Sequence, residues 1–389
     1  MKPRRRMQLA MSGGRPDRTP FMCQMSIGHM LQQLNVAAAD FWCDPRVFAD
    51  GLVRLQRQYG FDGILVSLHG HDPEWRQNIR ERFPTDGGES IRWNDGSVTF
   101  FPLDDLPHHT PVSEPEPREI DPSLIPKEID YIPVSQGLHF HVHPKHAFDI
   151  LHRVRSLAGS DVAIHAEVTS PFDYFLDWLG HERGLMVLID DPLTASLMLK
   201  KFAAGVAVIA DGMCREDIDA IKISSPFAGA GFLSRSHYEE FILPHERTVV
   251  EAIQRTGIPA YLHTCGAIGD RLDLMKRTGA RGLECLDPPP IGSTDLEEAF
   301  RILGGSMFVK GNVDPVNTLL LASDAQMRED VCRRIALGKK YGRFILSTAC
   351  SIAPHVPKEK ILMMRSIVEQ DQPRKRTIFG KKAVHRHDT

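Results

Sequence analysis

The 389-residue sequence has no strong excess of either charge, because 47 Lys and Arg stand against 50 Asp and Glu, a formal net charge of −3. A near-neutral chain offers no global electrostatic argument for binding nucleic acid or an anionic membrane surface. No stretch approaches the roughly 18 uninterrupted apolar residues of a membrane span, and the basic N-terminus has no apolar segment typical of a secretory signal. The seven cysteines are odd in number and widely spaced, which is typical of reduced thiols rather than disulfides. We therefore expect a globular cytoplasmic protein that binds neither nucleic acid nor membranes.

Short, apolar, β-rich runs recur along the chain, and most are separated by helix-like segments. The eight runs begin at Phe21, Gly63, Val162, Ala220, Ala260, Gly282, Ser306 and Arg343. The clearest intervening helix, from Ser234 to Gly257, opens with a serine cap and closes with a glycine. Eight strand–helix repeats predict parallel strands with crossover helices, so the expected fold is α/β, a (β/α)8 TIM barrel. An open doubly wound sheet is disfavoured because no glycine-rich phosphate loop follows the first run.

An insertion at about residues 72–145 interrupts this repeat between the second and third predicted strands. Its stretch SIRWNDGSVTFF predicts a β-hairpin that turns at Asp95–Gly96, and a proline-rich, acidic surface segment follows. The insertion could form a lid over the substrate or a homodimer contact. We assign residues 1–370 to a single (β/α)8 domain and expect the basic tail, 371–389, to be disordered.

The stretch YLHTCG places a histidine and a cysteine two positions apart at the end of the fifth predicted strand. His263 and Cys265 share a face because side chains alternate along a strand. The C-terminal strand ends of such barrels form the active-site face, and Cys350 ends the eighth strand at the corresponding level. Catalytic zinc sites typically have three protein ligands and one open position, so these three residues are candidate zinc ligands. The alternative is that they are ordinary buried thiols and a hydrogen-bonded histidine. Cys214, Cys285 and Cys332 are interpreted as structural, whereas Cys23 in the first strand could face the mouth but has no evident partner.

The stretch HFHVHPKH, within the insertion, raises the alternative of a second metal site. His139, His141 and His143 share a face if that segment is extended. Three histidines without a carboxylate more often form a solvated or interface strand, which is the interpretation that we favour.

Several motifs together resemble those of a known superfamily. They are GGRPDRTPF, YGFDGILVS, IDAIKISSPFAGAGFLSRSHYEEFILPHERTVVEAI, YLHTCG, GLECLDPPP, VKGNVDP and STACSIAPHVPKEKI. With these motifs the chain resembles the uroporphyrinogen decarboxylase superfamily, and within it the zinc-dependent, corrinoid-linked methyltransferases. The resemblance covers most of the chain outside the insertion and the tail. It implies a (β/α)8 barrel, a zinc ion (Zn2+) held by His263, Cys265 and Cys350, and a corrinoid (cobalamin) cofactor. Because the sequence has no clear corrinoid-binding module, the cofactor would arrive on a corrinoid-binding partner protein.

The decarboxylase itself is a poorer match. Its first strand leads into an arginine motif that grips the substrate's carboxylates, whereas this sequence reads CQMSIGHM. Its catalytic aspartate is expected where ILVSLHG has Ser67 and His69, and STACS replaces its C-terminal histidine-bearing loop. A porphyrinogen with eight carboxylates needs cations in the cleft, which the sequence does not show.

Polar residues at other strand ends are candidates for catalysis or for orienting His263. Glu167 ends the third strand and Asp287 the sixth, while Asn312 and Asp314 follow the seventh. A metal-bound histidine usually donates its other N–H to a carboxylate or carbonyl, which one of these residues could supply. The alternative is that they cap helices or close turns.

The sequence therefore predicts a zinc-dependent methyltransferase that works between a corrinoid protein and a small molecule. The small molecule is a thiol as methyl acceptor, or a methyl ether, amine or thioether as methyl donor. Two alternatives stay open: a lyase acting on a tetrapyrrole, and a non-catalytic barrel with a structural zinc. A structural site would be closed by a fourth ligand, for which His355 is the nearest candidate.

Overall fold

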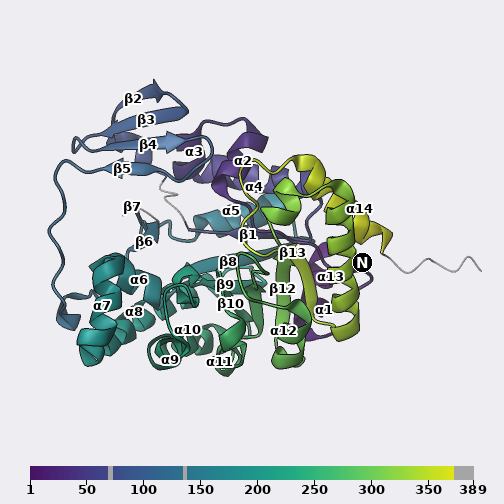
Figure 1. The fold of residues 1–389 in the computed structure, drawn as a ribbon. Coiled ribbons are helices and arrows are strands. Elements are labelled where there is room, and N and C mark those ends of the chain that lie inside the picture. The colour runs from purple at the N-terminus through teal and green to yellow at the C-terminus, as the bar shows by residue number, and fades with distance from the viewer. Residues whose placement is uncertain (69–72, 135–137, 372–389) are drawn as a thin grey trace, which may run out of the picture.

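Seven parallel strands form one curled sheet in the computed structural model, which describes residues 1–68, 73–134 and 138–371 (Figure 1). In sheet order the strands are β1 (Gly63–Val66), β8 (Ala163–Thr169), β9 (Ala220–Ser224), β10 (Ala260–Thr264), β11 (Gly282–Cys285), β12 (Phe308–Val313) and β13 (Phe344–Thr348). Neighbouring strands are parallel, and most of their residues are buried. Burial on both faces explains why they read as continuous apolar runs. The predicted α/β barrel fold is confirmed.

The first predicted strand, at residues 21–26, is not part of this ladder. It is an extended segment with isolated parallel bridges, one of which pairs Phe21 with Leu346 of β13. Its backbone also hydrogen-bonds to Asp62, directly before β1. The segment therefore takes the eighth place, between β13 and β1. It is short because Ser26 already caps the next helix.

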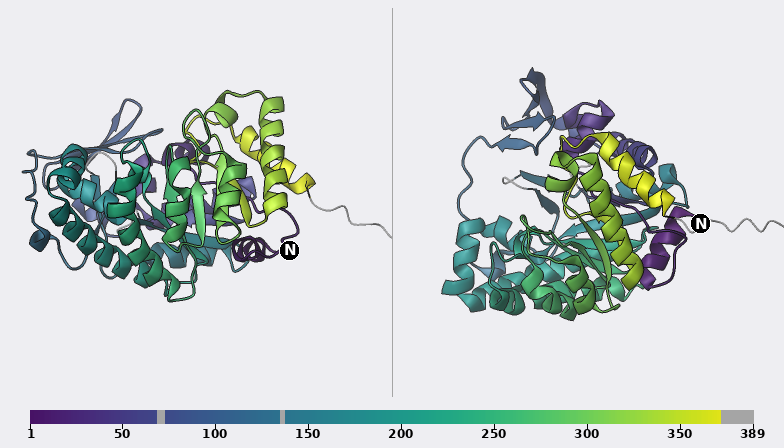
Figure 2. Two further views of the ribbon diagram at one scale, coloured as in Figure 1. Left: turned by 60° about the horizontal axis from the view of Figure 1, so that its bottom comes forward. Right: turned by 45° about the vertical axis from the view of Figure 1, so that its right-hand side comes forward.

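Most helices follow the strands and cover the outside of the sheet, whereas α1 (Pro3–Ser12) precedes the strands and packs its apolar side chains against residues at their N-terminal ends (Figures 1 and 2). The others are α2 (Ile27–Leu34), α3 (Ala38–Cys43), α4 (Pro45–Tyr59), α5 (Asp149–Ala158), α6 (Pro171–Leu179), α7 (His181–Asp190), α8 (Pro192–Met213), α9 (Arg235–His237), α10 (Leu243–Gln254), α11 (Leu272–Arg277), α12 (Leu296–Leu303), α13 (Asp324–Tyr341) and α14 (Lys358–Gln370). The helix predicted from Ser234 is confirmed: the serine side chain accepts the N–H of His237, and helical structure runs to the end of α10.

Among the described residues, α8 is the one helix whose length and composition would allow it to cross a membrane. Half of its most apolar window is buried. It packs against α6 and α10, as the core helix of a globular fold does.

The insertion between β1 and β8 carries two small antiparallel sheets. One contains β2 (Ile79–Thr85), β3 (Gly88–Trp93), β4 (Val98–Pro102) and β5 (His108–Thr110), and the other contains β6 (Tyr131–Val134) and β7 (Leu138–His141). The predicted hairpin is confirmed, because β3 and β4 pair across the turn at Asp95–Gly96. In Figure 1 the four-stranded sheet stands beside α3, away from the barrel helices α9–α12. His69 and residues 372–389 of the predicted tail lie outside the described residues.

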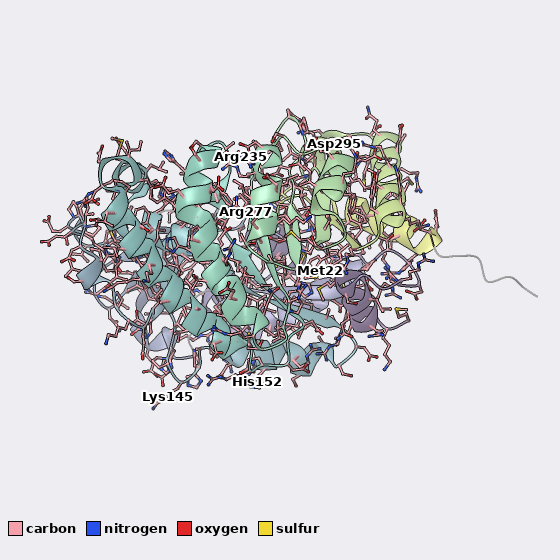
Figure 3. All side chains as sticks on the ribbon, turned by 90° about the horizontal axis from the view of Figure 1, so that it is seen from below. Met22, Lys145, His152, Arg235, Arg277 and Asp295 are labelled. Carbon is pink, nitrogen blue, oxygen red and sulfur yellow. The ribbon has the colours of Figure 1, made fainter. Side chains whose placement is uncertain are left out.

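Charged side chains lie on the outer faces of the barrel helices, as Figure 3 shows for Arg235 and Arg277. Arg235 pairs with Asp273 at 2.6 Å and Arg277 with Glu239 at 2.5 Å, and all four side chains are substantially exposed. Exposed pairs of this kind contribute about 0–1 kcal/mol each. The fold therefore depends mainly on its buried core and not on these surface ion pairs.

Candidate metal centre

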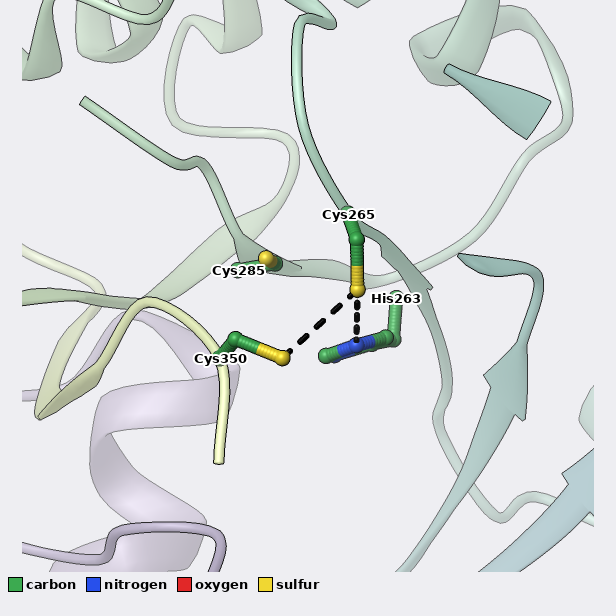
Figure 4. Close-up of side chains that lie close together, drawn as sticks. All are labelled: His263, Cys265, Cys285 and Cys350. Carbon is green, nitrogen blue, oxygen red and sulfur yellow. Dashed lines mark hydrogen bonds between the residues drawn. The ribbon is translucent and has the colours of Figure 1, made fainter. Parts of the chain in front are cut away.

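Three predicted metal ligands converge at the C-terminal ends of β10 and β13 (Figure 4). The Sγ atom of Cys265 lies 3.3 Å from Nε2 of His263 and 3.6 Å from Sγ of Cys350, which is 85 positions away in the sequence. Gly266 follows with a φ of +75°, a left-handed conformation that glycine adopts easily, so the chain leaves the strand directly after Cys265. Cys265 and Cys350 are partly exposed, so the cluster lies at the barrel mouth.

The spacing of these atoms fits a tetrahedral zinc site. Sulfur ligands at about 2.3 Å and a nitrogen ligand at about 2.1 Å from zinc stand about 3.8 Å (sulfur to sulfur) and about 3.6 Å (sulfur to nitrogen) apart. The observed separations of 3.6 Å and 3.3 Å are close to these values. Thiolate and imidazole donors together also suit zinc chemically.

A fourth possible ligand, Cys285, lies in the same cluster. The ligand atoms of all four residues lie within 4.8 Å of one another: His263, Cys265, Cys285 and Cys350. The interpretation of Cys285 as purely structural therefore needs correction. The fourth ligand considered from the sequence, His355, is exposed, and its Nδ1 lies 3.2 Å from the side-chain nitrogen of Gln32.

Glu284 of β11, which was not among the predicted candidates, orients His263. Its Oε2 lies 3.0 Å from Nδ1 of the imidazole, so Nε2 faces the thiols. The two residues are register partners across β10 and β11, which explains how neighbouring strands position them. Metal-binding histidines commonly have a carboxylate in this position, where it fixes the ring orientation and makes the ligand nitrogen more basic.

Two buried lysines of nearby strands neutralise the charge of Glu284. Lys310 of β12 bonds to its Oε1, and Lys222 of β9 lies 3.9 Å from its Oε2. Burial alone would raise the pKa of Glu284, but the two lysine charges hold it well below its usual range. Two cations therefore lie inside the barrel, but both are fully buried and paired with carboxylates. A lysine within an apolar strand run, as in AIKIS and FVKGN, is the signal that could have identified them.

Hydrogen bonding among the three thiols and their burial give them different pKa values. Contacts with Cys265 and Cys285 lower the pKa of Cys350 well below the ordinary thiol value. Burial raises the pKa of Cys285. For His263, burial alone would lower the pKa, but the charge of Cys265 and the hydrogen bonds with Cys265 and Cys350 together outweigh it and raise the pKa. The cluster thus already stabilises a negatively charged sulfur, which is the form that binds metals.

Glu167 of β8 lies inside the barrel but does not orient His263. Its Oε1 is 2.8 Å from Nζ of Lys222, and its Oε2 accepts the hydroxyl of Ser67 at 2.5 Å. Lys222 lies between Glu167 and Glu284, and Glu284 contacts His263, so ion pairs connect Glu167 to the candidate metal ligands.

Asp287 adjoins the cluster directly. Its Oδ2 accepts the backbone N–H of Gly266 at 2.6 Å and the S–H of Cys285 at 3.2 Å. Burial raises the pKa of this carboxyl group. Asp287 therefore holds the loop that follows Cys265 and contacts the fourth thiol.

Asn312 and Asp314 are engaged elsewhere. The side-chain amide of Asn312 donates to the carbonyl of Leu286 at 2.7 Å, and its oxygen accepts a bond from Arg334 of α13. Asp314 accepts the N–H of Val316 at 2.8 Å, which closes a turn. The structure thus uses Asn312 to fix the backbone after β11 and does not place its amide on the metal ligands.

The histidines of the insertion do not form a common site. His139 lies 2.7 Å from Asp177, and His141 lies 4.0 Å from Asp130. The group of possible metal ligands found among the described residues does not include them or His143.

A cavity of about 240 Å³ lies between the extended segment at residues 21–26, helices α2–α4 and strand β1, and its described lining contains none of the four cluster residues. Ser351, which follows Cys350, lines it together with Gln24 and Glu167. Much of the wall is apolar and includes Met25, Ile27, Met30, Trp42, Leu52 and Phe61. No lysine or arginine is among the described residues that line this cavity.

The family of this barrel follows from comparison with known proteins. The family model described as uroporphyrinogen decarboxylase (URO-D) matches residues 111–370. The chain therefore belongs to the uroporphyrinogen decarboxylase family, whose superfamily consists of enzymes, both decarboxylases and methyltransferases.

Individual relatives match only part of their length. The chain is 28% identical over 200 residues to the uroporphyrinogen decarboxylase of Saccharopolyspora erythraea, covering 50% of this chain and 53% of that protein. It is 35% identical over 144 residues to that of Syntrophotalea carbinolica, covering 36% and 38%. The chain thus spans about half, or less, of the length of the curated relatives that it matches.

A solved structure matches nearly the whole chain. It is a methyltransferase from Methanosarcina mazei, with a TM-score of 0.70 and 15% identity, and the match covers 95% of this chain and 99% of that one. At this identity the likeness establishes the shared fold.

Proposed function

We propose that this protein is a zinc-dependent methyltransferase that moves a methyl group between a small molecule and a corrinoid carried by a partner protein. The observation that carries the proposal is the convergence of His263, Cys265 and Cys350 at the barrel mouth, at separations suited to zinc. Bound zinc would hold a substrate thiol as its thiolate, or polarise a methyl ether, amine or thioether.

The residues of the chain divide the remaining tasks. Glu284 keeps the imidazole of His263 turned toward the metal position, and Lys222 and Lys310 balance the buried negative charge. Asp287 holds the backbone at Gly266, so the loop after the ligand Cys265 keeps its place. We assign these groups to holding and balancing the candidate metal ligands.

The cavity lined by Ser351 and Glu167 favours a small substrate. Its volume of about 240 Å³ is below the roughly 300–1,000 Å³ of pockets that hold drug-sized ligands. Its apolar wall suits the hydrocarbon part of a methylated compound, and Glu167 is the carboxylate at its edge. Because Glu167 is already paired with Lys222 and the described lining holds no lysine or arginine, a neutral methyl compound fits better than an anionic one.

Decarboxylation of a tetrapyrrole is the second candidate, because the family model and the curated relatives carry the decarboxylase name. A substrate with many carboxylates needs cationic side chains that face it. The two lysines within the barrel are already paired with Glu167 and Glu284, and the described lining of the cavity adds no others. This arrangement favours the methyltransferase.

A methyl-transfer assay tests the proposal. Purified protein, loaded with zinc, is mixed with reduced free cobalamin, as a probe for the corrinoid protein, and a panel of methyl ethers, amines and thioethers. The formation of methylcobalamin is followed by absorbance, and the reverse reaction is run with methylcobalamin and thiols. We expect turnover in wild type and in Cys332→Ser, which alters an exposed cysteine, but at least a hundredfold less in Cys350→Ser. Conversion of uroporphyrinogen without any methyl transfer would contradict the proposal and favour the second candidate.

A further inference from the structure

Cys285 lies close enough to the other three cluster residues to offer a fourth sulfur to the same metal. Its sulfur lies within 4.8 Å of the ligand atoms of His263, Cys265 and Cys350, and its side chain is fully buried (Figure 4). We propose that Cys285 is a fourth ligand of the metal at this site and that the substrate displaces it on binding. This inference rests on the metal binding of the proposed function, but it concerns a residue that the three-ligand site does not require.

The backbone at the end of β11 is arranged so that Cys285 reaches the cluster. Consecutive side chains of a regular strand point to opposite faces. Glu284 points inward to His263, so a regular strand would direct Cys285 outward to the helices. Instead, Cys285 and Leu286 have φ values of +82° and +57°, in the left-handed region that residues other than glycine rarely adopt. Such outliers persist where the surrounding structure enforces them, and they are concentrated at functional sites.

Gly311 of the neighbouring strand makes this backbone possible. A Cβ atom at position 311 would lie 2.8 Å from the carbonyl oxygen of Cys285, closer than real Cβ contacts allow. Because β12 carries a glycine at this point, the carbonyl can take the position that the unusual φ requires. The neighbouring strand thus accommodates the conformation that places the Cys285 thiol in the cluster.

Asp287 offers a hydrogen-bond acceptor to the Cys285 thiol when it is not bound to the metal. The S–H of Cys285 donates to Oδ2 of Asp287 at 3.2 Å, while the N–H of Gly266 holds the same oxygen at 2.6 Å. When a thiol substrate enters, the bond from Cys285 sulfur to the metal breaks and the bond from substrate sulfur forms. The proton that the substrate thiol loses is taken up by the Cys285 sulfur, so no other acceptor is required. Displacement reconciles four protein ligands, which are typical of closed structural sites, with catalysis at an open position.

Cobalt substitution tests the inference without an activity measurement. The full-length protein is loaded with Co2+, whose charge-transfer absorbance from thiolate ligands grows with their number. We expect Cys285→Ser to lose about one third of this absorbance, because three thiolates become two, and Cys332→Ser to match wild type. Titration with 2-mercaptoethanol should restore the lost third in Cys285→Ser. In wild type it should shift the visible cobalt bands without increasing the charge-transfer absorbance.

Competition gives a second, independent readout. Since 2-mercaptoethanol must displace Cys285 in wild type, its half-saturating concentration should be at least about tenfold lower in Cys285→Ser. Cys285→Ala, checked by circular dichroism, should behave in the same way and excludes coordination by the serine oxygen.

Three outcomes would overturn the inference: equal charge-transfer absorbance in wild type and Cys285→Ser, a gain of one thiolate by wild type on titration, or equal half-saturation in both. Each of these leaves the three-ligand site intact. Failure of folded wild type to bind Co2+ or Zn2+ would instead contradict the proposed function itself.

Discussion

The replacement Glu284→Gln tests how the buried charges support the metal centre. It removes a carboxylate that has two roles: it orients His263, and it neutralises the charges of Lys310 and Lys222. Loss of such an outer partner weakens metal binding about 10–100-fold, which corresponds to about 1.4–2.7 kcal/mol. Leaving a buried charge without its partner also lowers the free energy of unfolding by about 3–5 kcal/mol. Because domains have about 5–15 kcal/mol in total, we expect the variant to fold with reduced stability.

The double variant Glu284→Gln/Lys310→Met separates the two effects. Removing the unpaired lysine should recover much of the free energy of unfolding, measured with urea, because one buried charge is no longer uncompensated. Zinc affinity, measured by competition with a chromophoric chelator, should stay weakened because His263 still lacks its carboxylate. Wild-type zinc affinity in Glu284→Gln, or recovery of that affinity in the double variant, would refute the orienting role of Glu284.

Two further predictions concern stability away from the metal. Asp62 is buried and pairs with Arg6 at 2.6 Å and Arg18 at 2.9 Å, so Asp62→Asn should lower the free energy of unfolding by about 3–5 kcal/mol at unchanged zinc content. The exposed control Asp50→Asn should change it by less than about 1 kcal/mol. Equal effects of the two variants on unfolding by urea would contradict this prediction. Burial lowers the pKa of His165 from 6.5 to about 4. Between pH 6.5 and about 4, His165 therefore binds a proton in the unfolded chain but not in the native state. The free energy of unfolding falls as the pH falls through this window, by up to about 3 kcal/mol. His165→Gln should flatten this part of the pH profile in urea unfolding, and an unchanged profile would count against the assignment.

Much of the fold could be predicted from the sequence because the strands are buried on both faces and appear as short apolar runs. Seven of the eight predicted strands are ladder strands, and the hairpin at Asp95–Gly96 is present. The exception is the run from Phe21, which has the same composition but meets its neighbours only at single bridges. Composition reports burial, and it does not report how many residues stay in register with the next strand.

The candidate metal ligands were predictable only in part. His263 and Cys265 stand two apart on one strand, so alternation places them together, and the barrel topology brings Cys350 to the same end. Cys285 was missed because alternation beside Glu284 would turn it outward, and only the left-handed φ at the strand end reverses this.

The supporting charges were missed for a different reason, although the lysines within the apolar runs AIKIS and FVKGN were visible in the sequence. Candidates were sought at strand ends, whereas Glu284, Lys222 and Lys310 lie within strands and face the interior. Which carboxylate meets His263 depends on the register between β10 and β11, and a single sequence does not report that register.

The zinc content of purified protein tests the central claim most directly. It should be measured by elemental analysis, after purification without chelators, for wild type, Cys350→Ser and the exposed control Cys332→Ser. We predict about one zinc per chain in wild type and in the control, and its loss or strong depletion in Cys350→Ser with the circular dichroism spectrum unchanged. Wild type without zinc that also fails to take it up, or Cys350→Ser with full zinc occupancy, would contradict a metal centre built on His263, Cys265 and Cys350.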